Sequence, residues 1–156
     1  MSRQFIRVPG AFVLVCALTL LARAQDRCSS AGVAGTYAVT CHGFLTPGPS
    51  APMLPAALLA RAVADKDGNW TGTAGTLSIG GSIVTLTVQS VGPAQVNPDC
   101  TGTITYAQTI DGQPGPNSHF NFIVEKNSEI IDGISSDPGT AFSCTLTRQN
   151  KQAENR

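Results

Sequence analysis

Charged residues are scarce in this chain of 156 residues, of which only 13% are Asp, Glu, Lys or Arg. Ten Lys and Arg balance ten Asp and Glu, so the formal net charge is zero. A nucleic-acid-binding domain normally carries a strongly basic surface, and the charge balance argues against one. A disordered tail would have fewer apolar residues than the 42% found here. The length suits a single domain.

No apolar run is long enough for a membrane-spanning helix, which needs about 20 residues. The run at 11–21 has eleven residues, follows Arg3 and Arg7, and precedes a small-x-small sequence at 22–24. These are the three parts of a secretory signal peptide. We therefore expect residues 1–24 to be removed, with no membrane span after processing and a secreted or periplasmic protein. An uncleaved anchor or a buried helix is the alternative.

Processing would change the charge balance. Arg3, Arg7 and Arg23 would leave with the signal peptide, which carries no acidic residue. Seven basic and ten acidic side chains would remain, a net charge of −3. This balance argues further against nucleic acid and against anionic membrane surfaces as partners. The remaining chain divides into one domain at 25–148 and a polar tail at 149–156, which we expect to fray.

The cysteines contain no C-x-x-C motif. Cys16 lies within the expected signal peptide, so Cys28, Cys41, Cys100 and Cys144 remain. Their wide spacing does not suit a zinc site, which is the alternative interpretation. An even number of cysteines in an exported chain predicts two disulfides, and four cysteines permit three pairings.

Catalytic signatures are also missing: there is no G-x-S-x-G, no P-loop and no Cys–His nucleophile pair. Asp65, Asp67 and Asn69 resemble the start of a calcium loop, but Thr76 stands where that loop needs Glu. We interpret this segment as a hairpin turn. The sequence therefore predicts no catalytic residue, no metal site and no cofactor.

The chain does contain many short segments rich in Thr, Val and Ile, in which apolar and polar residues alternate. Turn sequences such as Asp111-Gly112 separate them. We expect eight strands, at about 35–43, 58–65, 69–79, 83–91, 100–109, 118–126, 129–135 and 140–148. Residues 53–64 have helical propensity, but the hairpin sequence at 65–70 favours a strand from about 58 to 65, with a short helical turn near 55–58 as the alternative for its start.

Eight short strands with hairpin connections predict an all-β fold, and an eight-stranded antiparallel up-and-down barrel fits them best. A barrel of this size holds either packed side chains or one small ligand. No internal repeat and no second domain is visible in the sequence.

Four segments resemble a group of uncharacterised exported bacterial proteins: Asp67-Gly68-Asn69, Val96-Asn97-Pro98-Asp99-Cys100-Thr101-Gly102-Thr103, His119-Phe120-Asn121-Phe122 and Asp137-Pro138-Gly139-Thr140. The resemblance implies a small antiparallel barrel similar to the lipocalin and allene oxide cyclase barrels. It implies no catalytic residues. Gly35-Thr36-Tyr37 is similar to the G-x-W opening of lipocalins, with Tyr in place of Trp.

Alternating strand directions predict which loops share a rim of the barrel. The connections 44–57, 80–82, 110–117 and 136–139 fall at one rim, and 66–68, 92–99 and 127–128 fall at the other. Long loops at one end of a rigid scaffold are where binding residues usually lie. The candidate ligand-binding residues at this rim are His42, Phe44, Asn117 and His119.

The alternation of side chains along a strand indicates the direction in which two of these candidates point. His42 lies opposite the apolar face of its strand, and His119 lies opposite Phe120 and Phe122. If the large apolar residues fill the barrel, both histidines face solvent.

The same alternation predicts the disulfide pairing. Cys41 and Cys144 lie on the apolar faces of the first and last strands, which become neighbours when the barrel closes. We therefore expect Cys41 to bond to Cys144, and Cys28 to bond to Cys100 at the opposite rim.

The leading functional hypothesis is an exported, disulfide-stabilised, non-enzymatic barrel whose lumen holds a small apolar ligand. A barrel enzyme of the isomerase or cyclase kind is an alternative, and it would need His or carboxylate side chains converging in the lumen. An envelope or surface interaction module is another, and it would need an exposed apolar patch. The sequence does not give the oligomeric state.

Overall fold

The computed structural model describes residues 28–46, 51–125 and 128–149. One short helix and ten strands lie in these ranges: α2 (Ser30–Val33), β1 (Gly35–Leu45), β2 (Leu54–Ala64), β3 (Trp70–Ile79), β4 (Ser82–Ser90), β5 (Gln95–Val96), β6 (Thr101–Ile110), β7 (Gln113–Pro114), β8 (Ser118–Glu125), β9 (Ile130–Ser135) and β10 (Thr140–Arg148). The expected signal peptide at 1–24 and all of the expected tail except Gln149 lie outside the described residues.

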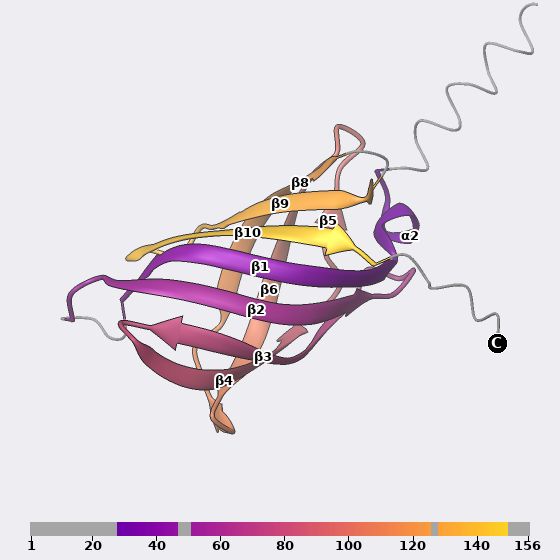
Figure 1. The fold of residues 1–156 in the computed structure, drawn as a ribbon. Coiled ribbons are helices and arrows are strands. Elements are labelled where there is room, and N and C mark those ends of the chain that lie inside the picture. The colour runs from indigo at the N-terminus through magenta and orange to yellow at the C-terminus, as the bar shows by residue number, and fades with distance from the viewer. Residues whose placement is uncertain (1–27, 47–50, 126–127, 150–156) are drawn as a thin grey trace, which may run out of the picture.

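Eight of the strands close into a barrel. β1, β2, β3, β4, β6, β8, β9 and β10 are hydrogen-bonded in that order, and β10 returns to β1 (Figure 1). Every pairing is antiparallel, including the β4–β6 pairing that completes the circle. The two-residue strands β5 and β7 pair with opposite ends of β6. The predicted all-β, eight-stranded antiparallel barrel is therefore confirmed.

The strand favoured at about 58–65 is present and begins earlier, at Leu54, so no helical turn forms near 55–58. β2 begins at Leu54 and pairs with β1 along its whole length, starting from Leu45 opposite Leu54. β3 pairs with the other edge of β2. Backbone hydrogen bonds on both sides therefore outweigh the helical propensity of this Ala- and Leu-rich segment. The loop that follows β1 shortens accordingly, to residues 46–53.

Side chains alternate between the lumen and the outer surface along each barrel strand. On β1, Tyr37, Val39 and Cys41 are buried in the interior, while Thr40 and His42, on the opposite face, are exposed. On β2, the even-numbered positions from Leu54 to Ala64 are the more buried ones. The apolar faces predicted from the sequence therefore point inward.

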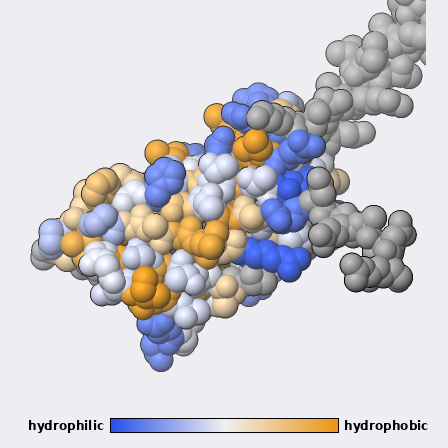
Figure 2. Space-filling view, viewed as in Figure 1, coloured by the Kyte–Doolittle hydropathy of each residue, from blue (hydrophilic) through white to orange (hydrophobic). Residues whose placement is uncertain are grey.

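The outer surface mixes polar residues with separate apolar ones. Leu59 on β2 and Ile83 on β4 are the most exposed of the large apolar side chains, at 64% and 67%. In Figure 2 apolar residues lie between polar ones on the face shown, and hydrophilic residues gather at the end where α2 lies. No helix in the described ranges is long and apolar enough to cross a membrane.

Both predicted disulfides are present. Cys41 and Cys144 lie directly opposite each other on β1 and β10, and they bond across this strand pair. Cys28, just before α2, bonds to Cys100 at the start of β6. The first bridge lies in the wall of the barrel, and the second holds the N-terminal segment across one end. Two disulfides suggest that the protein folds in an oxidising, extracellular-type environment.

Candidate functional site

The barrel encloses a cavity of about 460 Å³. All eight barrel strands contribute to its walls, which are mostly apolar: Val39, Cys41, Leu45, Leu58, Ala60, Ala62, Trp70, Leu77, Ile79, Leu86, Val88, Ile104, Ile110, Phe120, Phe122, Ile131, Phe142 and Leu146. This volume lies in the range of about 300–1,000 Å³ that is usual for small-molecule sites. The lumen is thus hollow rather than filled by side chains.

Small residues on the inward face of the strands produce this hollow. Ala60 and Ala62 on β2, Gly72 on β3 and Gly133 on β9 all line the cavity. A Cβ atom added at Gly133 would meet its nearest neighbour, the Asn121 carbonyl oxygen, at 3.4 Å, an ordinary contact. Glycine at this position therefore leaves space in the lumen that a larger side chain would fill.

The cavity reaches one rim of the barrel. Thr46, Asn117, Asp137 and Pro138 line it, and they belong to the loops 46–53, 111–117 and 136–139. None of the described residues in α2, or in the loops 65–69 and 91–100, lines it. The rim predicted to carry the binding residues is therefore the open end, and the opposite rim is the closed end.

Arg148 is the central side chain at the closed end. Its guanidinium donates hydrogen bonds to the backbone carbonyls of Gly32, Ala34 and Ser128, at 2.8–2.9 Å, and to the Tyr37 hydroxyl at 2.8 Å. It also lies 5.3 Å from the centroid of the Tyr37 ring, a cation–π distance. One side chain at the end of β10 thereby ties α2, β1 and Ser128 together.

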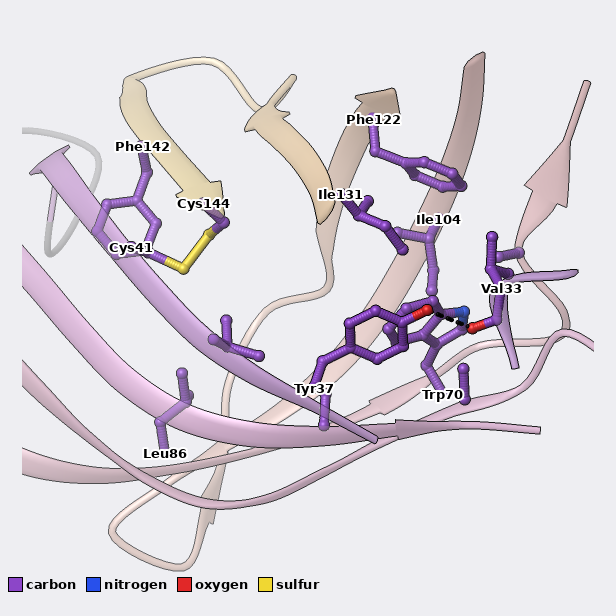
Figure 3. Packing of buried hydrophobic residues seen from close by; sticks show 14 of the residues in the cluster. Val33, Tyr37, Cys41, Trp70, Leu86, Ile104, Phe122, Ile131, Phe142 and Cys144 are labelled. Atoms are coloured by element: carbon purple, nitrogen blue, oxygen red, sulfur yellow. Dashed lines mark hydrogen bonds between the residues drawn. A yellow bond between two sulfur atoms is a disulfide. The ribbon is translucent and has the colours of Figure 1, made fainter. Parts of the chain in front are cut away.

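Tyr37 fills the space beneath this arginine. The ring is fully buried and packs against Trp70 with centroids 5.3 Å apart. Its hydroxyl donates to the Val33 carbonyl of α2 at 2.7 Å, as the dashed line in Figure 3 shows. Burial raises the pKa of Tyr37, although the charge and the hydrogen bond of Arg148 lower it in part. The closed end is thus tightly packed, with the Tyr37 hydroxyl and the Arg148 guanidinium hydrogen-bonded, while the Trp70 indole N–H has no partner among the described residues.

Two polar side chains on β6 interrupt the apolar lining. Tyr106 and Gln108 follow Ile104 on the inward face of the strand, two residues apart. Among the described residues, no group forms a hydrogen bond with the Tyr106 hydroxyl or with the Gln108 carboxamide. The Tyr106 ring makes an edge-to-face contact with Phe120, at a centroid distance of 6.1 Å. Burial strongly raises the pKa of Tyr106. The accessible part of its side chain faces the lumen and not the outer surface.

Asp137 is the one carboxylate among the described residues that line the cavity. It accepts hydrogen bonds from the backbone N–H of His119 at 2.9 Å and pairs with the His119 ring at 2.6 Å. Desolvation alone would raise the pKa of Asp137, but the bonds with His119 and with the Ser135 hydroxyl outweigh it and lower the pKa. The mouth of the cavity therefore carries an ionised carboxylate at neutral pH.

The structure brings only part of the predicted rim site to the cavity. Asn117 lines the mouth. His42 and Phe44 lie on the outer face of β1, where Phe44 is 49% exposed. His119 also lies on the outer side, with 52% of its side chain exposed, and its ring pairs with Asp137 at the mouth.

The lumen residues that sequence reasoning missed have a recognisable signal. Tyr106 and Gln108 belong to the alternating pattern of 101–110, in which they share a face with Ile104 and Ile110. Ala60, Ala62 and Ala64 of β2 are spaced every second residue, which indicates an inward face of small side chains once the segment is known to be a strand. The helical propensity of that segment concealed this pattern.

The described residues contain no group of three or more His, Cys, Asp or Glu side chains that could hold a metal ion. No family model, curated protein or solved structure matches this chain. The barrel implied by the resemblance to exported small-barrel proteins is present, and it rests on the strand pairings of the structure itself.

Proposed function

We propose that this protein is an exported, disulfide-stabilised barrel that binds a small, largely apolar molecule in its lumen. The observation that carries this proposal is the 460 Å³ apolar cavity, which is closed at one end and reaches the rim at the other. An engineered apolar cavity of about 150 Å³ binds benzene. If the number of ligand atoms scales with cavity volume, the lumen would suit a molecule of roughly 15–20 non-hydrogen atoms.

The chemistry of the lining favours binding over catalysis. A barrel isomerase or cyclase would need acid and base groups facing one another across the lumen. The described lining residues supply one carboxylate, Asp137, at the mouth, and both histidines lie on the outer side. Export to the periplasm or the medium is supported by the signal-peptide pattern at 1–24 and by the two disulfides.

A fluorescence titration with N-phenyl-1-naphthylamine tests the proposal. This neutral dye has 17 non-hydrogen atoms and brightens in apolar surroundings. A binding free energy of about −0.3 kcal/mol per non-hydrogen atom of the dye predicts a dissociation constant below about 200 μM. The Ala60→Phe variant, which adds a ring at a cavity-lining position of β2, should abolish binding. Ala57→Phe adds the same ring on the exposed outer face of β2 and should bind like the unmodified protein.

Equal dye binding by both variants would place the dye on the surface and contradict the proposal. Circular dichroism should show that Ala60→Phe is folded, and a smaller variant at the same site, Ala60→Leu, provides a second test. Native mass spectrometry of protein isolated from its own periplasm or medium should show an added mass of a few hundred daltons that the Ala60→Phe protein lacks.

A further inference from the structure

The lumen contains polar groups that its apolar character alone does not require. Tyr106 and Gln108 project from the same face of β6 into the cavity, and neither side chain has a hydrogen-bond partner among the described residues. Buried polar groups in folded proteins are nearly always hydrogen-bonded. At the closed end the Tyr37 hydroxyl obeys that rule, since it bonds to both Val33 and Arg148. The indole N–H of Trp70, which packs against Tyr37, is buried without a hydrogen-bond partner among the described residues. The two β6 side chains therefore offer their hydrogen bonds to a molecule in the lumen.

The charges around the cavity restrict what that molecule can be. Asp137 lines the mouth and is held ionised by its bonds with His119. Arg61 contacts the cavity from β2, but it occupies an outward position between Ala60 and Ala62, and its side chain is exposed. No cationic side chain among the described residues projects into the lumen. A carboxylate or sulfonate there would be buried without a counter-charge and would meet Asp137 on its way in.

The remaining chemistry is a neutral polar group on an apolar body. A tyrosine hydroxyl donates and accepts, and a carboxamide does both, so together they suit an alcohol, a ketone or an amide. Such a group would satisfy side chains that an all-hydrocarbon ligand would leave unpaired. The apolar body would lie against the apolar lining of the lumen, which includes Phe120 in contact with Tyr106 and Val88 opposite Gln108.

We propose that the lumen selects neutral ligands carrying one hydrogen-bonding group, which the Tyr106 hydroxyl and the Gln108 carboxamide hold. This inference rests on the proposed binding function and names the chemical class of its ligand. It predicts discrimination in two directions, against plain hydrocarbons and against anions.

Three molecules on one scaffold test it: biphenyl, 4-biphenylmethanol and biphenyl-4-carboxylate, each measured by displacement of N-phenyl-1-naphthylamine. We expect 4-biphenylmethanol to displace the dye at a concentration roughly 2- to 12-fold lower than biphenyl, the gain of one net hydrogen bond. We expect the carboxylate to be weaker than the alcohol by roughly 100-fold or more, because its charge would be buried unpaired.

Variants assign the preference to the two side chains. Tyr106→Phe and Gln108→Leu should each reduce the advantage of the alcohol over biphenyl, and the double variant should remove it, while affinity for biphenyl itself is kept or improved. Thr103→Val, which removes a hydroxyl from the exposed outer face of β6, should leave the preference intact.

The outcomes separate this inference from the proposal beneath it. If none of the three molecules displaces the dye and the dye itself does not bind, lumen binding fails. If biphenyl and its alcohol bind equally to the unmodified protein, or the carboxylate binds best, lumen binding stands and the neutral-ligand inference is overturned. A preference that survives in the double variant would also overturn it.

Discussion

The two tyrosines of this chain occupy opposite situations within one barrel. Tyr37 at the closed end is fully buried, and its hydroxyl bonds to the Val33 carbonyl and to Arg148. Tyr106 on β6 faces the cavity, and its hydroxyl has no partner among the described residues. The closed end thus uses the Tyr37 hydroxyl for stability, whereas the lumen keeps the Tyr106 hydroxyl available. The comparison indicates that the two ends have different roles.

The largest effect is expected from emptying the closed end. Tyr37→Ala would remove a ring that contacts Trp70 and Arg148, and would leave the hydrogen-bonding groups of Arg148 and Val33 short of a partner. We expect a loss of about 3–5 kcal/mol in the free energy of unfolding, measured by urea denaturation. Phe44→Ala, an aromatic truncation on the outer surface near the open end, should change it by less than about 0.5 kcal/mol. Similar losses for both variants would remove the distinction.

Removing the disulfide at the closed end should lower the free energy of unfolding somewhat less than Tyr37→Ala does. The Cys28–Cys100 disulfide joins residues 72 positions apart and holds the segment leading into α2. The variant Cys28→Ala with Cys100→Ala should lose about 2–4 kcal/mol in urea denaturation, mainly because the unfolded chain becomes less constrained. Amide hydrogen exchange should increase first in α2. Faster exchange spread evenly over all strands would contradict a local role for this bridge.

Removing the hydroxyl of Tyr37 or of Tyr106 alone should have a smaller effect on stability, and it compares the two hydroxyls directly. Tyr37→Phe leaves a buried carbonyl and an arginine donor without their partner, so we expect a loss of about 1–3 kcal/mol. Tyr106→Phe breaks no hydrogen bond within the described protein, and stability should stay within about 0.5 kcal/mol or rise. Urea denaturation of both variants measures the difference. A loss at Tyr106 as large as that at Tyr37 would indicate a structural role for both.

The smallest effect concerns the mouth and depends on pH. The pKa of Asp137 is lowered in the folded protein, so its carboxylate stabilises the fold above the ordinary Asp pKa near 4. This contribution is lost as the pH falls from there through the folded-state pKa. Asp137→Asn should therefore reduce stability at pH 6 by less than about 1 kcal/mol, and the difference from the unmodified protein should shrink towards pH 3. A difference that is constant with pH would show that the charge is not its source.

Alternation along the strands made the wall of this barrel predictable. The inward faces of β1 and β10 and the Cys41–Cys144 pair follow from which residues lie on the apolar face, Cys28–Cys100 is the pair that then remains, and the structure confirms both disulfides in a closed barrel. At β2 the hairpin sequence that follows indicated the strand, but its start at Leu54 was not predicted, because pairing with β1 and β3 is a long-range effect that a short window of sequence does not contain.

The interior was harder to predict than the wall. Whether eight strands enclose packed side chains or a cavity depends on the summed volume of the inward residues. Small residues such as Ala60 and Gly133 lower that volume, and they lie on strands that are far apart in the sequence. The rim loops were placed correctly, yet of the four candidate residues only Asn117 lines the mouth. Tyr106 and Gln108 become candidate binding residues because no described residue across the lumen forms a hydrogen bond with their side chains. The sequence alone does not show this, because it depends on the three-dimensional structure.

The division between a stabilising end and a binding lumen is tested most directly by measuring affinity in the two hydroxyl-deletion variants. Displacement of N-phenyl-1-naphthylamine by 4-biphenylmethanol and by biphenyl should show the preference for the alcohol unchanged in Tyr37→Phe and reduced in Tyr106→Phe. If Tyr37→Phe loses the preference while Tyr106→Phe keeps it, the assignment of binding to the lumen face of β6 is contradicted.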